Sequence, residues 1–129
     1  MSFILVPNRG EDVKVNAWNW RPTLVLLRRA NLINEETHER LGIHGGGGHV
    51  DAHTCGRITD FLEGRLKSMQ PGQRIRADLT VADKPKKQIV FTPGMKTDDI
   101  DGNELYSATY EWLVMFKDFC KISEGFKVS

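Results

Sequence analysis

The sequence predicts an α+β fold, a small, mostly antiparallel sheet packed with three or four helices. Residues 13–17 and 74–81 place apolar side chains at every second position, as strands with one buried face do. Other stretches place apolar residues three or four positions apart, which is the spacing of one face of a helix. Because these strands and helices do not alternate regularly along the chain, we do not expect a doubly wound parallel sheet.

The composition is that of an ordinary globular domain. The chain has 129 residues, of which 40% are hydrophobic and 27% charged, so we expect a single domain, residues 1–129. A formal net charge of +1 provides no general attraction to nucleic acid or membranes, and we expect neither as a partner. Met1–Pro7 lacks the basic start and the length of a signal peptide or membrane anchor, which favours a cytoplasmic protein. Cys55 and Cys120 lie far apart in the sequence, and we expect free thiols.

The first elements expected are a β-hairpin and a helix. The apolar run 3–6 is stopped by the turn-forming residues 7–10, and the alternating run 13–17 follows, so the two runs can pair. A helix is then expected to begin near Pro22, because a proline in the first helical turn forfeits no hydrogen bond. Apolar residues at helical spacing continue this helix to Ala30.

Two further helices are predicted by their capping residues. Asn34 begins a short helix, with acids in its first turn, that ends at Gly42. Asp51 begins a longer helix, which Pro71 and Gly72 end. The apolar face of this longer helix consists of Cys55, Ile58, Phe61, Leu62, Leu66 and Met69.

The second half of the chain predicts two strands, a helix and a terminal strand. The strand at 74–81 is followed by a turn at 83–86 and a returning strand at 88–92. Asn103 is expected to cap the last helix, and residues 126–128 to form a strand after it.

Three short motifs resemble those of a loose group of small, uncharacterised bacterial proteins. They are Asn19–Pro22, the segment Val50–Ala52 after a glycine run, and the stretch from Glu111 to Phe126. The resemblance spans most of the chain. It implies no known activity, and therefore assigns no functional role to any residue.

A cluster of histidines predicts an alternative metal site. His44, His49, Asp51 and His53 lie within ten positions, and imidazole and carboxylate groups suit a tetrahedral zinc ion. Their spacing matches neither His-Glu-x-x-His nor paired Cys-x-x-Cys motifs. Capping of the following helix is sufficient to explain Asp51. Our first expectation is therefore no cofactor, with zinc as the alternative.

Two weaker hypotheses concern the same region. The glycine run Gly45–Gly48 leads toward a helix N-terminus, where backbone N–H groups can bind an anion. It lacks the lysine of a phosphate-binding loop, and a flexible interhelical loop is the alternative. Cys55, near His53, has the position of an activated nucleophile. Because Cys55 continues an apolar helix face, we expect a buried structural cysteine instead.

Trp18, Trp20 and Arg21 form the candidate binding surface. Aromatic residues beside an arginine often dominate binding interfaces, although we expect one indole in the core and the other partly exposed. No set of residues combines a nucleophile, a base and an oxyanion stabiliser. The sequence therefore predicts a small non-enzymatic binding or interaction protein, with a regulatory role as one option and a protein or small molecule as partner. The alternative is a metal-binding protein or metal-dependent hydrolase.

Overall fold

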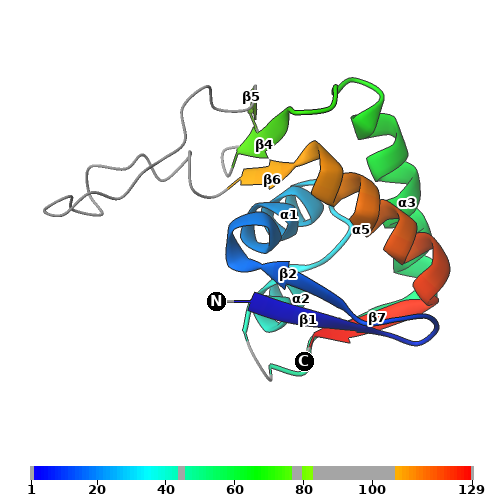
Figure 1. Ribbon diagram of the computed structural model, residues 1–129. Coiled ribbons are helices and arrows are strands. Elements are labelled where there is room, and N and C mark those ends of the chain that lie inside the picture. The colour runs from blue at the N-terminus through cyan, green and yellow to red at the C-terminus, as the bar shows by residue number, and fades with distance from the viewer. Residues whose placement is uncertain (1, 44–45, 77–79, 83–106, 129) are drawn as a thin grey trace, which may run out of the picture.

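The computed structural model describes residues 2–43, 46–76, 80–82 and 107–128 (Figure 1). Within these residues the chain forms four helices and two antiparallel sheets, of four and three strands. This arrangement confirms the predicted α+β class. None of the helices in the described ranges is long and apolar enough to cross a membrane.

The four-stranded sheet joins both ends of the described chain. Its order is β2 (Val13–Asn16), β1 (Ser2–Pro7), β7 (Gly125–Val128) and β3 (His49–Asp51), and all neighbours are antiparallel. The β1–β2 hairpin and the terminal strand confirm the sequence predictions. Strand β3 is new, because the sequence indicated a loop running directly into a helix cap.

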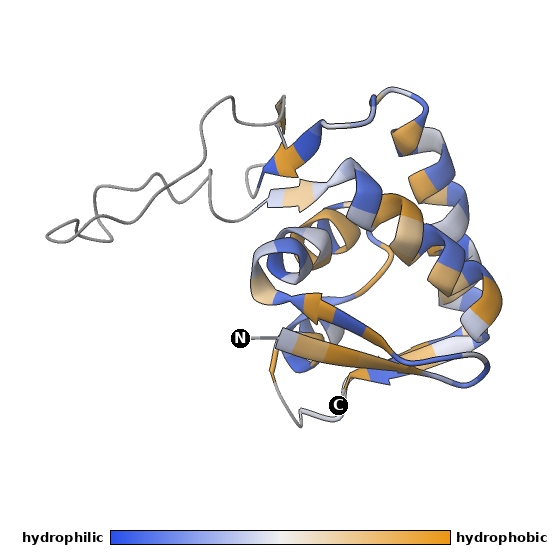
Figure 2. Ribbon diagram, viewed as in Figure 1, coloured by the Kyte–Doolittle hydropathy of each residue, from blue (hydrophilic) through white to orange (hydrophobic). Residues whose placement is uncertain are grey.

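The core lies between this sheet and the helices. Along β1 the side chains alternate between buried Phe3 and Leu5 and exposed Ile4, so one face of the sheet is covered. Figure 1 shows α1 (Ala17–Arg29), α3 (Ala52–Leu66) and α5 (Tyr110–Ser123) on the same side of the sheet. Apolar residues gather where these elements face one another (Figure 2).

Helix α1 begins five residues earlier than Pro22. Asn16 is its N-cap, and the side-chain oxygen of Asn16 accepts a hydrogen bond from the N–H of Asn19 at 2.9 Å. This bond satisfies a donor of the first turn and so fixes the start of the helix. Pro22 is therefore inside the helix, and Trp18 to Arg21 belong to its first turns rather than to a strand end.

The two helices predicted from their caps are confirmed. Helix α2 (Glu35–Leu41) has Asn34 as N-cap and Gly42 as C-cap. Helix α3 begins after Asp51, whose carboxylate accepts a hydrogen bond from the N–H of Thr54 at 2.7 Å. Helix α3 ends at Leu66, before Pro71 and Gly72 are reached.

The predicted continuous strand 74–81 is wrong. Instead, β4 (Arg74–Arg76) pairs antiparallel with β5 (Val81–Ala82) and, on its other edge, with β6 (Ser107–Thr109). The N–H of Arg76 donates to the carbonyl of Thr80 at 2.9 Å.

Helix α5 is capped by Thr109, whose hydroxyl accepts a hydrogen bond from the N–H of Trp112 at 3.1 Å. It follows β6, which was not predicted. The expected turn at 83–86, the returning strand at 88–92 and the cap at Asn103 lie outside the described residues.

Candidate functional site

Trp18, Trp20 and Arg21, the candidate binding surface, all lie on α1, but the two tryptophans do not share a face of that helix. Residues two positions apart on a helix point to nearly opposite sides. Trp20 accordingly has 0% of its surface exposed, and Trp18 has 38%. The expected split between one core and one exposed indole is confirmed, but Trp20 is removed from the binding surface. Arg21 is exposed and belongs to a groove described below.

Trp20 instead positions α2 against α1. Its indole N–H donates to the backbone carbonyl of Leu41, at the end of α2, at 2.9 Å. The ring packs edge-on against Trp112, Phe116 and Phe126, with centroid distances of 5.6 to 6.4 Å. A buried indole N–H needs such an acceptor, so this bond fixes where α2 lies relative to α1.

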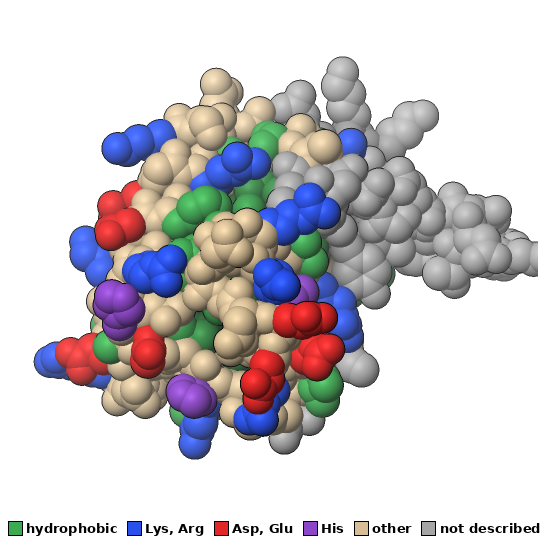
Figure 3. Space-filling view, turned by 180° about the vertical axis from the view of Figure 1, so that it is seen from behind, with side chains coloured by type: hydrophobic (Ala, Val, Ile, Leu, Met, Phe, Trp, Pro, Cys, Tyr) green, Lys and Arg blue, Asp and Glu red, His purple; other side chains and the backbone are tan. Residues whose placement is uncertain are grey.

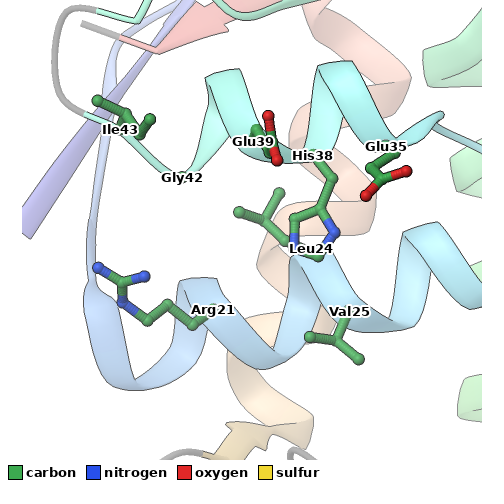
Figure 4. Close-up of a pocket in the computed structure, with 8 residues that line it drawn as sticks. All are labelled: Arg21, Leu24, Val25, Glu35, His38, Glu39, Gly42 and Ile43. Atoms are coloured by element: carbon green, nitrogen blue, oxygen red, sulfur yellow. The ribbon is translucent and has the colours of Figure 1, made fainter.

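A groove of about 800 Å³ runs between α1 and α2, and we call it the α1–α2 groove (Figure 4). Its lining residues are Arg21, Leu24, Val25, Glu35, His38, Glu39, Gly42 and Ile43. Figure 4 shows Arg21 and Ile43 toward one end and Glu35 toward the other, with His38 between the two helices.

Helical spacing explains why these side chains share the groove. On α1, Arg21, Leu24 and Val25 occupy positions i, i+3 and i+4, which lie on one face. On α2, Glu35, His38 and Glu39 repeat the same spacing. The α1 face supplies one cation and an apolar floor, whereas the α2 face supplies two carboxylates and an imidazole.

The electrostatics of the groove are polarised along its length. Burial, and secondly the nearby Arg28 guanidinium, lower the pKa of His38 below its ordinary value of 6.5, while Glu39 and Glu35 act in the opposite direction. His38 is therefore neutral at pH 7. The remaining formal charges are positive at Arg21 and negative at the two glutamates.

The groove combines an apolar floor with an exposed apolar rim. None of the eight described residues that line the groove carries a hydroxyl or thiol nucleophile. Leu24 is almost fully buried in the floor, whereas Ile43 at the rim has 58% of its surface exposed. Acidic and basic side chains are interspersed over the molecular face in Figure 3. Selection of a partner would therefore depend on local charge order rather than on net charge.

Three of the four residues of the predicted metal site lie in the described part of the chain. His49 and Asp51 lie on the exposed face of β3, and His53 is exposed in the first turn of α3. His44 lies outside the described residues. The Thr54 N–H is the main cause that lowers the pKa of Asp51, with smaller contributions from His53 and His49. In the described part of the chain, no three His, Cys, Asp or Glu residues meet in a group able to hold a metal ion.

Two of the three described glycines of the run, Gly46 and Gly48, pack closely against the backbone at the end of α2, whereas Gly47 faces open space. A Cβ at Gly48 would lie 2.7 Å from the Leu41 nitrogen, and one at Gly46 would lie 2.8 Å from the Arg40 oxygen. The Gly48 carbonyl accepts a hydrogen bond from Val128 at 3.1 Å. Glycine is thus needed there for close backbone approach. Strand β3 separates the run from α3, so the glycines do not lead directly into a helix N-terminus.

Comparison with protein-family models, with curated proteins and with solved structures finds no match for this chain. The resemblance to small bacterial proteins therefore stays a prediction.

Of the eight residues that line the groove, only Arg21 belongs to the binding surface predicted from sequence. The polar residues of α2, Glu35, His38 and Glu39, were not predicted as site residues, and the acids in the first turn of this helix were predicted only to interact with the helix dipole. Glu35, His38 and Glu39 lie at positions i, i+3 and i+4, and this spacing is the sequence pattern that predicts a shared helix face. The opposing face of α1 could not be paired with them from sequence, because the Trp20 to Leu41 bond decides which faces meet.

Proposed function

We propose that the protein is a non-enzymatic binding module and that a short segment of a partner protein occupies the α1–α2 groove. The observation that carries this proposal is the charge order of the groove. Arg21 lies toward one end, an apolar floor in the middle, and Glu35 toward the other end. A segment with an acidic residue, apolar residues and a basic residue in this order complements the groove along its length.

The size of the groove supports a short segment. The groove follows α2, and a helix of seven residues is about 10 Å long. Three to four residues of extended chain span about the same distance. The apolar floor of Leu24 and Val25 and the exposed Ile43 supply the surface that such a segment buries.

Parallel peptide selections test this proposal. A phage-displayed library of random short peptides is selected on the full chain and on its Arg21→Glu variant. We expect peptides with an acidic residue from the first selection and with a basic residue at the matching position from the second, because reversing Arg21 reverses the charge it prefers.

The matched control is Arg29→Glu, an exposed arginine of the same helix that does not line the groove. This variant is expected to select the same peptides as the wild type. If wild type and Arg21→Glu select the same peptides with equal affinity, the groove is not the binding site. A preference that changes with Arg29→Glu would equally contradict the proposal.

Zinc binding is the second candidate function, as a metal-binding protein or metal-dependent hydrolase. It is favoured by the placement of His49 and Asp51 on one exposed face of β3, with His53 two residues further on. Elemental analysis of protein purified without an affinity tag tests it. Stoichiometric zinc that is absent from a His49→Ala/His53→Ala variant supports the site, and metal-free wild-type protein after incubation with zinc contradicts it.

A further inference from the structure

A second hollow adjoins the α1–α2 groove at Glu35, and we call it the loop hollow. It has a volume of about 260 Å³. Its lining residues are Arg28, Asn31, Leu32, Ile33, Asn34 and Glu35. Glu35 lines both the groove and the loop hollow, and in Figure 4 it lies toward one end of the groove. A segment that follows the groove past Glu35 therefore enters the loop hollow.

The loop hollow adds a second cation in line with Arg21. Arg28 lies seven positions after Arg21 on α1, and Leu24 and Val25 lie between them at positions i+3 and i+4. These four residues form one stripe along the helix. Seven positions of a helix span about 10 Å, and three residues of extended chain span about the same distance. An extended segment can therefore place one carboxylate at Arg21 and a second one, three residues later, at Arg28.

The guanidinium of Arg28 is available for a ligand. The backbone carbonyls of residues 26–28, at the end of α1, accept hydrogen bonds from the N–H groups of residues 30–32, so they do not need this side chain. No acidic side chain in the described part of the chain forms an ion pair with Arg28. A half-buried cation without a paired acid is a natural partner for an anionic group.

The other walls of the loop hollow suit the last residue of a chain. The side-chain oxygen of Asn34 accepts the N–H of Thr37, so the amide nitrogen of Asn34 remains as a donor. Asn31 supplies a second side-chain amide. Ile33 is buried and Leu32 is half-buried, and together they form an apolar wall. A terminal carboxylate needs cationic and amide donors, and an apolar side chain on the same residue needs such a wall.

The connection between the two helices closes the groove at this end. Residues 30–34 join the end of α1 to the start of α2 and also line the loop hollow. A segment that runs from Arg21 toward Glu35 meets this connection just beyond Glu35. An internal segment would have to turn outward there in order to continue, whereas a chain end needs no turn. The closed end thus favours a terminus over an internal acidic side chain.

We propose that the α1–α2 groove and the loop hollow together bind the C-terminal end of a partner protein, with its terminal carboxylate at Arg28. This inference rests on the proposed function and adds where the bound segment ends and in which direction it runs. The last residue is apolar and contacts Leu32, and the residue before it is basic and pairs with Glu35. An acidic residue three positions before the last one pairs with Arg21. The basic residue also neutralises Glu35, which would otherwise repel the terminal carboxylate.

Peptide display in two formats tests the proposal. One random library of short peptides is displayed on phage either with free C-termini or with the C-termini joined to the coat protein, and both formats are selected on the full chain. We expect stronger enrichment in the free format, with an acidic residue three positions before the last and a basic residue next to the last. Equal enrichment in the two formats would contradict the recognition of a chain end.

A selected peptide is then synthesised as the free acid and as the C-terminal amide, and calorimetry measures the dissociation constant of each. We expect the amide to bind the wild type about tenfold more weakly, because Arg28 loses its anionic partner. Equal affinities would overturn the proposal. This comparison uses only the wild-type chain, so a folding defect cannot obscure it.

Two variants assign the effect to Arg28. In Arg28→Gln, the free acid should bind as weakly as the amide, with circular dichroism as the folding check. Arg29→Gln is the matched control, because Arg29 is exposed and lines neither hollow, and it should preserve the tenfold difference. A tenfold difference that persists in folded Arg28→Gln would contradict the placement of the carboxylate.

The failure of this inference can be told apart from the failure of the proposed function. If the acid and the amide bind equally but Arg21→Glu weakens both, the groove binds a segment whose end is not recognised. If neither library format yields a peptide whose binding depends on Arg21, the proposed function fails and this inference fails with it.

Discussion

The indole N–H of Trp20 donates a hydrogen bond to the backbone carbonyl of Leu41 at 2.9 Å, and this bond ties α1 to the end of α2. Both groups are buried. The bond therefore has two consequences. It satisfies two polar groups in the core, and it fixes the relative position of the helix faces that line the α1–α2 groove.

Trp20→Phe is expected to reduce the free energy of unfolding by about 1–3 kcal/mol, because it leaves the Leu41 carbonyl buried without its donor. Urea denaturation measures the change. Trp18→Phe is the matched control, and at this partly exposed position we expect a change of about 0.5 kcal/mol or less. Equal effects of the two substitutions would show that the bond does not position the helices.

The caps of α2 and α3 should respond differently to pH. The Thr54 N–H lowers the pKa of Asp51 below its ordinary value of 3.8. The ionised carboxylate therefore stabilises the folded state above that pH, and this contribution is lost as the pH falls through the lowered pKa. We expect Asp51→Ala to destabilise the protein at pH 7 and to have a smaller effect in acid.

Asn34 caps α2 through a neutral amide, so Asn34→Ala should cost about 1 kcal/mol at either pH. Urea denaturation of both variants at neutral and acidic pH measures the difference. An Asp51→Ala effect that does not diminish in acid would mean that the charge of Asp51 is irrelevant to the cap.

The pKa of His38 should lie below 6.5, chiefly because of burial and secondly because of Arg28. Since the folded protein binds this proton less well than the unfolded chain does, His38 lowers stability as the pH falls below 6.5. Titration of the imidazole resonances by NMR gives the value directly. Arg28→Gln should raise the pKa, whereas Glu39→Gln should lower it further. Shifts in the reverse directions would contradict this account of the α1–α2 groove.

Gly48→Ala should destabilise the protein by about 1–3 kcal/mol, because its Cβ would lie 2.7 Å from the Leu41 nitrogen and force a backbone shift. Gly64→Ala is the control. It lies inside α3, and its Cβ would meet nothing within 4 Å. Removing a helical glycine there should instead stabilise by about 0.5–1 kcal/mol. Urea denaturation measures the change in the free energy of unfolding for each variant. Changes of opposite sign confirm the close approach at Gly48, and changes of the same sign contradict it.

Several elements could be predicted from sequence because their causes are local. Asn34, Gly42 and Asp51 act on backbone groups within a few positions, so their side-chain chemistry identifies the helix ends. Asn16 acts in the same local way at the start of α1, so its side chain is a better predictor of this helix end than Pro22 is. The alternating run at 13–17 predicts strand β2 because the alternation continues over enough positions to be detected.

Sequence patterns alone thus predict the α+β class, the caps of α2 and α3, the N-terminal hairpin and the split between a buried and an exposed tryptophan. Three features arise only when distant segments pack together: β3 pairs with β7, β4 pairs with β5 and β6, and α1 and α2 form a groove. The packing of α3 against α5 likewise places Cys55 Sγ 3.7 Å from the hydroxyl oxygen of Ser123. A cap or an alternating face is encoded within one segment, whereas pairing depends on how distant segments bury their apolar surfaces together. A three-residue strand is too short to reveal that pairing through its own pattern.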